Sequence, residues 1–138
     1  MERAIQITTI NVNGLKDVSK RTRLFTALRF KASDIIFVQE THCSNSTEMA
    51  KWQSEWGGRA FWSFGAVRCR GVAILLKPNL DAKVKYFHYD TDGRMLVVDI
   101  DLSGERYRLI NVYAPNDHAV RREWLNSIDR WCAGNRKI

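Results

Sequence analysis

The stretch Asp34–Glu40 reads D-I-I-F-V-Q-E, with four apolar residues in a row between polar neighbours. A short run that is apolar at every position, without alternation, is typical of a central strand buried on both faces. Glu40 follows this run directly, so its carboxylate would be held at the end of a rigid strand. Taken alone, Glu40 could equally be the first solvated residue beyond that strand.

Further strands are indicated on both sides of this run. Ala4–Ile10 alternates apolar and polar residues and ends near the turn signal Asn13-Gly14. The later part of the chain is mostly strand, at Ala60–Phe64, Gly71–Leu76, Lys83–Tyr89, Met95–Leu102 and Tyr107–Tyr113. Asp99 and Asp101 alternate with apolar residues and are expected to point away from the core.

Three helices are expected. Ser19 can cap a helix that runs through Phe30, and a brief helix begins at Thr47 and closes at Gly57-Gly58. Asp117 can cap a last helix with a regular apolar face, made by Val120, Trp124, Ile128 and Trp131. Helices outside a mixed, largely antiparallel sheet account for these elements, so the fold class is α/β, in the α+β sense.

Composition and charge narrow the function classes. The 138 residues suffice for one domain, and the net charge of +7, with a pI near 9.6, indicates a polyanionic partner. Three cysteines without a Cys-x-x-Cys pair argue against a disulfide framework or a zinc knuckle. Apolar stretches are too short to span a membrane and Met1–Asn11 has no signal-peptide pattern, so we expect an intracellular protein without membrane contact.

The positive charge is uneven. One basic segment carries a single acid, Asp17, and a second basic set lies near the end of the chain. The first comprises Lys16, Lys20, Arg21, Arg23, Arg29 and Lys31, and the second comprises Arg121, Arg122, Arg130, Arg136 and Lys137. Either set could simply be the solvated face of a helix, and charge alone does not separate DNA from RNA or an anionic membrane.

Polar side chains stand just past the carboxyl ends of three strands. Asn11 and Asn13 follow the first strand, Glu40 follows the second, and Tyr113 with Asn116 follows the last. A carboxylate with water and substrate phosphate suits Mg²⁺, while amide and phenol groups can contact phosphate oxygens. Each feature also has a plain structural explanation as a turn or a strand exit, so separately they are weak.

Four motifs in order are much more specific. They read I-N-V-N-G-L (Ile10–Leu15), V-Q-E-T-H (Val38–His42), R-G-V-A-I-L-L (Arg70–Leu76) and I-N-V-Y-A-P-N (Ile110–Asn116). This series resembles the endonuclease/exonuclease/phosphatase superfamily over most of the chain. Within the superfamily, the residues of these motifs are most similar to the apurinic-type endonuclease domain of non-LTR retrotransposons. They are somewhat less similar to exonuclease III-like abasic-site nucleases.

The resemblance implies a DNase I-like sandwich of two sheets with outer helices, and Mg²⁺-dependent hydrolysis of DNA, with Mn²⁺ as a substitute metal. By the family pattern, Asn11 contacts the scissile phosphate, Asn13 lies beside the metal and Glu40 binds it. Tyr113 matches the active-site tyrosine and Asn116 the loop after it, so Tyr113 and Asn11 are the catalytic candidates. Phosphate contacts are expected from Asn116, Lys16, Lys20, Arg21 and Arg23.

The sequence also departs from the family. Members continue with a Gly-Asp-x-Asn motif and a later Ser-Asp-His, and neither occurs in these 138 residues. Residues 1–138 are therefore expected to form a single, incomplete domain that supplies about one sheet and its helices. We expect the sheet face that the second half would cover to lie open, through Ile36, Val38, Ile74, Leu76, Ile110 and Val112.

Three functions follow from these expectations. The first is a DNA endonuclease domain, inactive by itself, nuclear, and prone to self-associate or to bind its second half in trans. The second is a non-catalytic remnant that binds nucleic acid or protein through its basic faces. The third is an enzyme of the same superfamily that acts on a phosphorylated lipid or inositol. The excess of basic residues and the retrotransposon-like motifs disfavour it.

Overall fold

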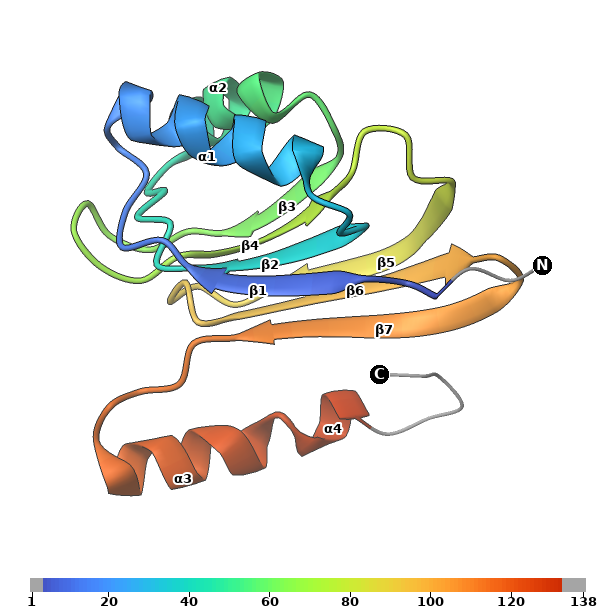
Figure 1. Ribbon diagram of the computed structural model, residues 1–138. Coiled ribbons are helices and arrows are strands. Elements are labelled where there is room, and N and C mark those ends of the chain that lie inside the picture. Colours follow the sequence, from blue (N-terminus) through green and yellow to red (C-terminus); the bar gives the residue numbers. More distant parts are fainter. Residues whose placement is uncertain (1–3, 133–138) are drawn as a thin grey trace.

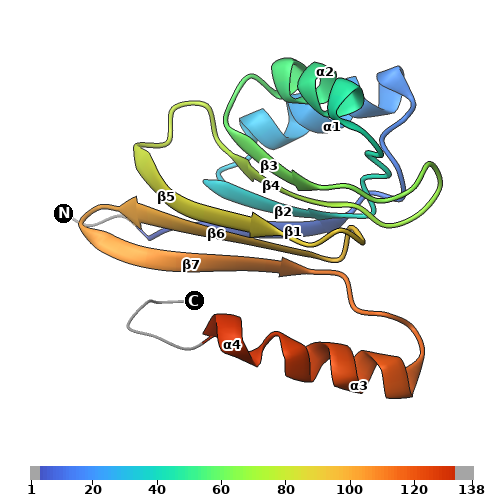
Figure 2. The same ribbon diagram turned by 180° about the vertical axis from the view of Figure 1, so that it is seen from behind.

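The computed structural model describes residues 4–132, which form two β-sheets lying one over the other, with helices on both outer sides (Figures 1 and 2). The first sheet has the strand order β1-β2-β4-β3, from β1 (Ile7–Asn11), β2 (Ile35–Gln39), β3 (Ala60–Ser63) and β4 (Val72–Leu76). The second has the order β5-β6-β7, from β5 (Ala82–Tyr89), β6 (Met95–Leu102) and β7 (Glu105–Val112). The two-sheet fold class is therefore confirmed.

The expectation of about one sheet needs correction, because the strands after Leu76 form a sheet of their own instead of extending the first. β1 and β2 are parallel, and every other pairing is antiparallel. Short hairpins join β5 to β6 and β6 to β7, which keeps these three strands together.

The apolar run that opens β2 explains how the layers join. Its alternate residues belong to two separate cores, since Ile36 and Val38 pack under the first helices while Ile35 faces the second sheet. All three are at most 1% exposed, as expected for a strand covered on both faces. Because one core packs against each face of β2, this strand is fixed from both sides up to its carboxyl end.

The core between the sheets overturns the expectation of an open apolar face. Ile74 and Leu76 of β4 are fully buried against second-sheet residues such as Leu96 and Val98. Ile110 and Val112 are half-buried. The expected face is closed because the chain supplies its own covering strands.

Two helices cover the outer side of the first sheet. They are α1 (Val18–Phe30) and α2 (Ser46–Trp56), and their buried Phe25 and Trp56 rings meet edge to face at 5.7 Å. The N-cap of α1 is Asp17, whose carboxylate accepts from the backbone N–H of Ser19, so the expectation of Ser19 as the cap was wrong. Asn45 caps α2, and Gly57 ends it in the left-handed conformation.

The outer side of the second sheet carries α3 (His118–Ser127) and α4 (Asp129–Cys132), where one continuous helix was expected. Asp117 caps α3 as predicted. Asp99 does point away from the inter-sheet core, but it is buried in a paired contact with Arg108. Trp131 of α4 stacks on His88 with ring centroids 4.5 Å apart, which anchors α4 on this face. Within residues 4–132, no helix has the length and apolar content needed to cross a bilayer.

Candidate active site

Three strands bring the polar candidates to one end of the molecule. Asn11 ends β1, Glu40 directly follows β2, and Tyr113 directly follows β7. The carboxyl ends of these strands lie on the same side, at the left of Figure 1 and the right of Figure 2. Asn11 and Glu40 come from the first sheet and Tyr113 from the second, so both sheets contribute to this end.

Asn11, Asn13 and Glu40 form a hydrogen-bonded unit. The side-chain amide of Asn11 donates to Glu40 Oε2 at 2.5 Å, and its Oδ1 accepts from the backbone N–H of Asn13 at 3.1 Å. The N–H of Gly14 donates to the Glu40 carbonyl at 2.7 Å. The Asn-Gly segment thus bends the chain after β1, and its backbone bonds to both the Asn11 side chain and the Glu40 carbonyl.

The loops around this unit hold several residues in an unfavourable backbone conformation. Asn13, Glu40, His42 and Arg70 have φ values of 51°, 56°, 60° and 61°. Such positions cost roughly 1–2 kcal/mol each for a residue with a side chain, and they cluster at functional sites. His42 N–H donates to the Arg70 carbonyl at 3.0 Å, which ties two of these loops together.

Two glycines allow the β5–β6 hairpin to reach the same loops. Gly71 N–H donates to the Gly93 carbonyl at 2.9 Å, and Thr41 N–H donates to Gly71 at 3.0 Å. A Cβ on Gly71 would lie 2.5 Å from the Thr41 hydroxyl, and one on Gly93 would lie 2.6 Å from the Phe64 carbonyl. This close approach of backbones requires glycine at both positions.

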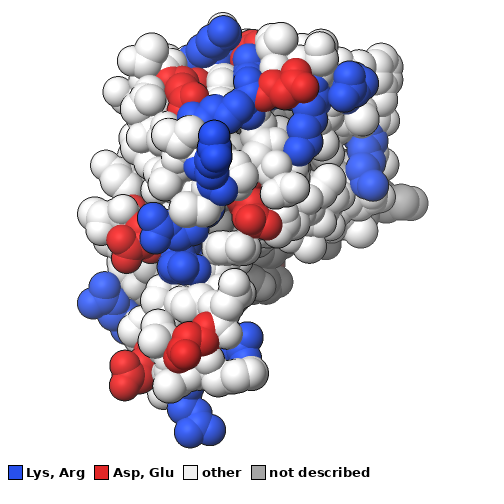
Figure 3. All heavy atoms as spheres, turned by 90° about the vertical axis from the view of Figure 1, so that its left-hand side faces the viewer, with Lys and Arg blue, Asp and Glu red and all other residues white. Residues whose placement is uncertain are grey.

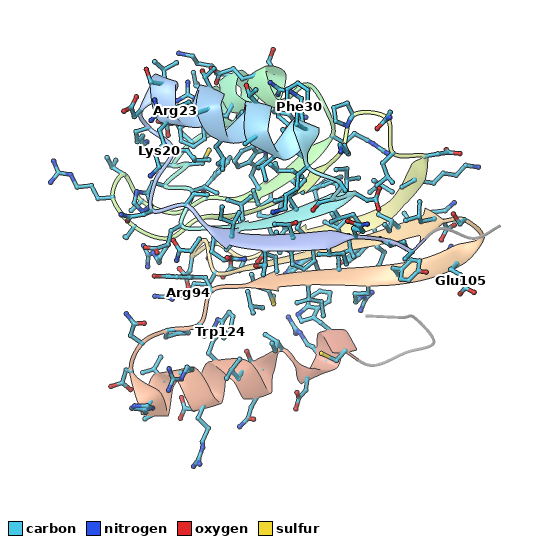
Figure 4. The ribbon with its side chains drawn as sticks, viewed as in Figure 1. Lys20, Arg23, Phe30, Arg94, Glu105 and Trp124 are labelled. Atoms are coloured by element: carbon cyan, nitrogen blue, oxygen red, sulfur yellow. The ribbon has the colours of Figure 1, made fainter. Side chains whose placement is uncertain are left out.

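Tyr113 interacts with both the Glu40 carboxylate and the Arg94 guanidinium. Burial raises the pKa of the Tyr113 phenol, and the negative charge of Glu40 and a hydrogen bond to it raise it further. The Arg94 guanidinium lies 5.6 Å from the centre of the Tyr113 ring and donates to the Tyr113 carbonyl at 3.1 Å. Figure 4 shows Arg94 at the same end of the molecule as the strand ends. Arg94 was not among the expected site residues, because it stands in none of the four motifs.

Two further polar residues were missed beneath this end. Asn111 is 1% exposed, and its amide donates to backbone carbonyls of the facing sheet. Gln39 donates to Asn111 Oδ1 at 2.9 Å. Both stand inside recognised motifs, I-N-V-Y and V-Q-E-T-H, but their pairing is a tertiary contact between strands that are distant in the sequence.

The expected phosphate-binding cations fall into two groups. Arg21 is 2% exposed and paired with Glu55, and it also donates to the Leu15 carbonyl, so its position does not fit a phosphate contact. Lys16 is paired with Glu48 at 2.5 Å. These two side chains join α1 and its approach loop to α2.

Lys20 and Arg23 are placed differently, on α1 at the end of the molecule where the strand ends gather (Figure 4). Lys20 Nζ donates to the Asn13 carbonyl at 3.2 Å, which places it beside the hydrogen-bonded unit. Figure 3 looks onto this end and shows Lys and Arg groups running down the face from the helical layer, with acidic groups among them. Asn116 is exposed in the segment between β7 and α3.

The site offers few charged ligands to a metal ion. Within residues 4–132, no group of three or more His, Cys, Asp or Glu side chains is arranged to hold a cation. Glu40 is half-buried and its neighbours Asn11 and Asn13 are amides. One carboxylate with amide oxygens fits Mg²⁺, which keeps several waters and binds through one or two carboxylates and substrate phosphate. It fits poorly with Zn²⁺, which takes nitrogen and sulfur ligands in a closed tetrahedron.

Two stacked sheets with outer helices, and this set of strand-end residues, define a DNase I-like α/β fold. Residues 8–137 match the model of the Endonuclease/Exonuclease/phosphatase family, and the chain belongs to that family. Over 93% of its length it is 30% identical to an uncharacterized 149 kDa protein of transposon TX1 from Xenopus laevis. It spans 10% of that protein.

Solved structures share the fold at lower identity. A 3′ phosphatase from Neisseria bound to a product DNA hairpin has a TM-score of 0.68 and 22% identity, over 94% of this chain and 51% of that one. An AP endonuclease from Archaeoglobus fulgidus has a TM-score of 0.68 and 20% identity, over 93% of this chain and 51% of that one. The described chain thus spans about half the length of these structures.

Proposed function

We propose that this chain is part of a Mg²⁺-dependent nuclease domain that hydrolyses phosphodiester bonds in DNA. The observation that carries the proposal is the 2.5 Å hydrogen bond between Asn11 and Glu40, beside which the negative charge of Glu40 also raises the pKa of Tyr113 from the facing sheet. A carboxylate, an amide and a phenol converging from two sheets can address a metal ion and the oxygens of one phosphate. The transposon protein and the DNA-processing structures above support the choice of DNA.

In this proposal Glu40 supplies the charged metal ligand, and the oxygens of Asn13 and Asn11 lie beside the ion. Bound Mg²⁺, or Mn²⁺ in its place, would neutralise the non-bridging phosphate oxygens and stabilise the leaving oxygen. Asn11 keeps one amide hydrogen beyond the one it donates to Glu40, and that hydrogen is available to a phosphate oxygen. The buried strand ends hold these groups in place before substrate arrives, which reduces the entropy lost on binding.

Tyr113 and Arg94 would act on the other side of the phosphate. Because burial and Glu40 raise the pKa of Tyr113, the phenol stays protonated at neutral pH and donates a hydrogen bond. Arg94 lies beside the Tyr113 ring, and its positive charge would offset the negative charge of a bound phosphate. Lys20, Arg23 and Asn116 would contact the flanking backbone, where contacts fix position without reading sequence.

A non-catalytic role in binding nucleic acid is the second candidate. It is favoured because, within residues 4–132, no group of three or more His, Cys, Asp or Glu side chains could hold a metal ion, so that metal-assisted hydrolysis would rest on the Glu40 carboxylate alone. Under either proposal, the 138 residues by themselves should not nick supercoiled plasmid above a Glu40→Ala control.

The test joins this chain to the carboxyl-terminal half of the Archaeoglobus AP endonuclease, of which it covers about half. We expect the chimera to nick plasmid with Mg²⁺ and to lose that activity with Glu40→Ala. A folded chimera that binds DNA without nicking it would favour the binding role. Nicking that persists in the Glu40→Ala chimera would overturn the assignment of Glu40.

A further inference from the structure

Asn111 is a fully buried polar residue in the apolar core between the two sheets. It lies on β7 and is 1% exposed, among buried residues such as Ile35, Val98 and Leu109. Its Nδ2 donates to the carbonyls of Val38 at 3.0 Å and Ala73 at 2.8 Å. Those two residues are register partners on β2 and β4. One side chain of the second sheet therefore uses both amide hydrogens on adjacent strands of the first sheet.

Gln39 completes the connection. Its Nε2 donates to Asn111 Oδ1 at 2.9 Å and to the Thr9 hydroxyl at 2.9 Å, which adds β1 to the set. The network therefore links β1, β2 and β4 to β7. If the two sheets moved past each other, the Asn111 amide and both carbonyls would be left unpaired in an apolar core, which is unfavourable for every one of these groups. The hydrogen bonds thus favour one relative position of the sheets.

That position is the one that brings the site together. Gln39 directly precedes Glu40, while Asn111 stands two residues before Tyr113 on the facing sheet. We propose that Asn111, together with Gln39, is a positioning residue that holds Tyr113 of the second sheet close to Glu40 of the first. Its importance for catalysis rests on the proposed function, whereas the geometric claim does not.

The decisive readout is the nuclear Overhauser contact between the Tyr113 ring and the Glu40 side chain, measured on the metal-free chain. Asn111→Leu keeps the volume and removes every hydrogen bond of the amide, and we expect this contact to be lost. Leu109→Ala is the matched control, because Leu109 lies on the same face of the same strand and is 4% exposed. That variant loses core packing and should keep the contact.

Gln39→Met provides a second variant in case Asn111→Leu does not fold. Gln39 is only half-buried, so its replacement should be tolerated, and we expect the contact between Tyr113 and Glu40 to weaken clearly. Wild-type intensity of the contact in every folded variant of Asn111 and Gln39 would overturn the proposal. Equal loss in Leu109→Ala would also overturn it, because any weakening of the core would then suffice.

Added Mn²⁺ separates this proposal from the proposed function. Paramagnetic broadening of the Glu40 and Asn11 signals in the wild-type chain supports a metal site, and its absence counts against the nuclease assignment. The contact between Tyr113 and Glu40 is read without metal, so it decides the role of Asn111 in either case.

Discussion

Glu40 combines a positive φ of 56° with a half-buried carboxylate that receives the Asn11 amide at 2.5 Å. The backbone conformation costs energy, and it is held in place because the Gly14 N–H donates to the Glu40 carbonyl and the Thr41 N–H donates to the Gly71 carbonyl. A glutamate that merely followed a strand would not require this conformation. The site geometry therefore favours the functional interpretation of Glu40 over the first solvated residue of a loop.

Binding of Mg²⁺ or Mn²⁺ should depend on Glu40. We expect Glu40→Gln to abolish calorimetric Mn²⁺ binding, since the remaining amides add no charge, while the wild-type chain binds more weakly than micromolar. Glu105→Gln is the control, because it makes the same substitution at the far end of β7 (Figure 4). Sub-micromolar binding by the wild-type chain, or unchanged binding by Glu40→Gln, would contradict the proposed ligand set.

For single residues, the sequence indicated candidates at strand ends and missed residues defined by tertiary contacts, even where, as for Asn111, they stand inside a motif. Asn11, Glu40 and Tyr113 were chosen as candidates because they stand at strand ends and within the family-like motifs. Arg94 and Asn111 act through partners far away in the sequence, and no local pattern reveals such pairs.

Among the elements, α1 shows where local patterns succeed and fail. The helix ends at Phe30 as predicted, but its N-cap is Asp17 and not the predicted Ser19. Either residue type can cap a helix, and the choice depends on where the preceding loop turns, which is set by the contacts of residues 12–15 with residues 39–41.

The cap of α1 can be tested with two alanine variants. Asp17→Ala should lower the free energy of unfolding by about 1 kcal/mol, because the first-turn N–H of Ser19 loses its acceptor. Ser19→Ala should change it by less than about 0.5 kcal/mol. Urea denaturation followed by tryptophan fluorescence measures both, and a larger effect at Ser19 would restore the original prediction.

The basic residues of α1 divide by burial. Arg21→Met breaks its pair with Glu55, whose side chain is 30% exposed. Broken buried pairs cost about 3–5 kcal/mol, and partial solvation of Glu55 reduces our expectation to about 2 kcal/mol. Arg23→Met, at an exposed position of the same helix, should stay within about 0.5 kcal/mol. Similar urea midpoints for the two variants would argue against a structural role for Arg21.

For the whole molecule, the family resemblance predicted the two-sheet fold correctly but misjudged how much of it this chain contains. The strands were located from alternation or from short apolar runs, and these patterns mark buried residues without saying which sheet a strand joins. Leu96 and Val98 of β6 pack in the core between the sheets, yet their partners Ile74 and Leu76 were expected to lie open. Assignment of strands to sheets is a long-range property, and here it converts the expected exposed face into a core.

The molecule as a whole should bind DNA through its charge, weakly, with strong dependence on salt and no preference for sequence. The net charge is +7, and Lys20 and Arg23 lie at the end of the molecule that carries the candidate active site. Each phosphate contact releases counterions, so the logarithm of the binding constant falls with the logarithm of the salt concentration by about 0.9 per contact. Replacing Lys20 and Arg23 together by alanine should therefore lower that slope by about 2. Fluorescence anisotropy with two unrelated duplexes across a salt series measures this slope.

Alanine at Lys83 and Lys85 of β5 is the control, because it removes the same charge elsewhere and should leave the slope nearly unchanged. An equal fall in both double variants would mean that net charge, and not this face, determines binding.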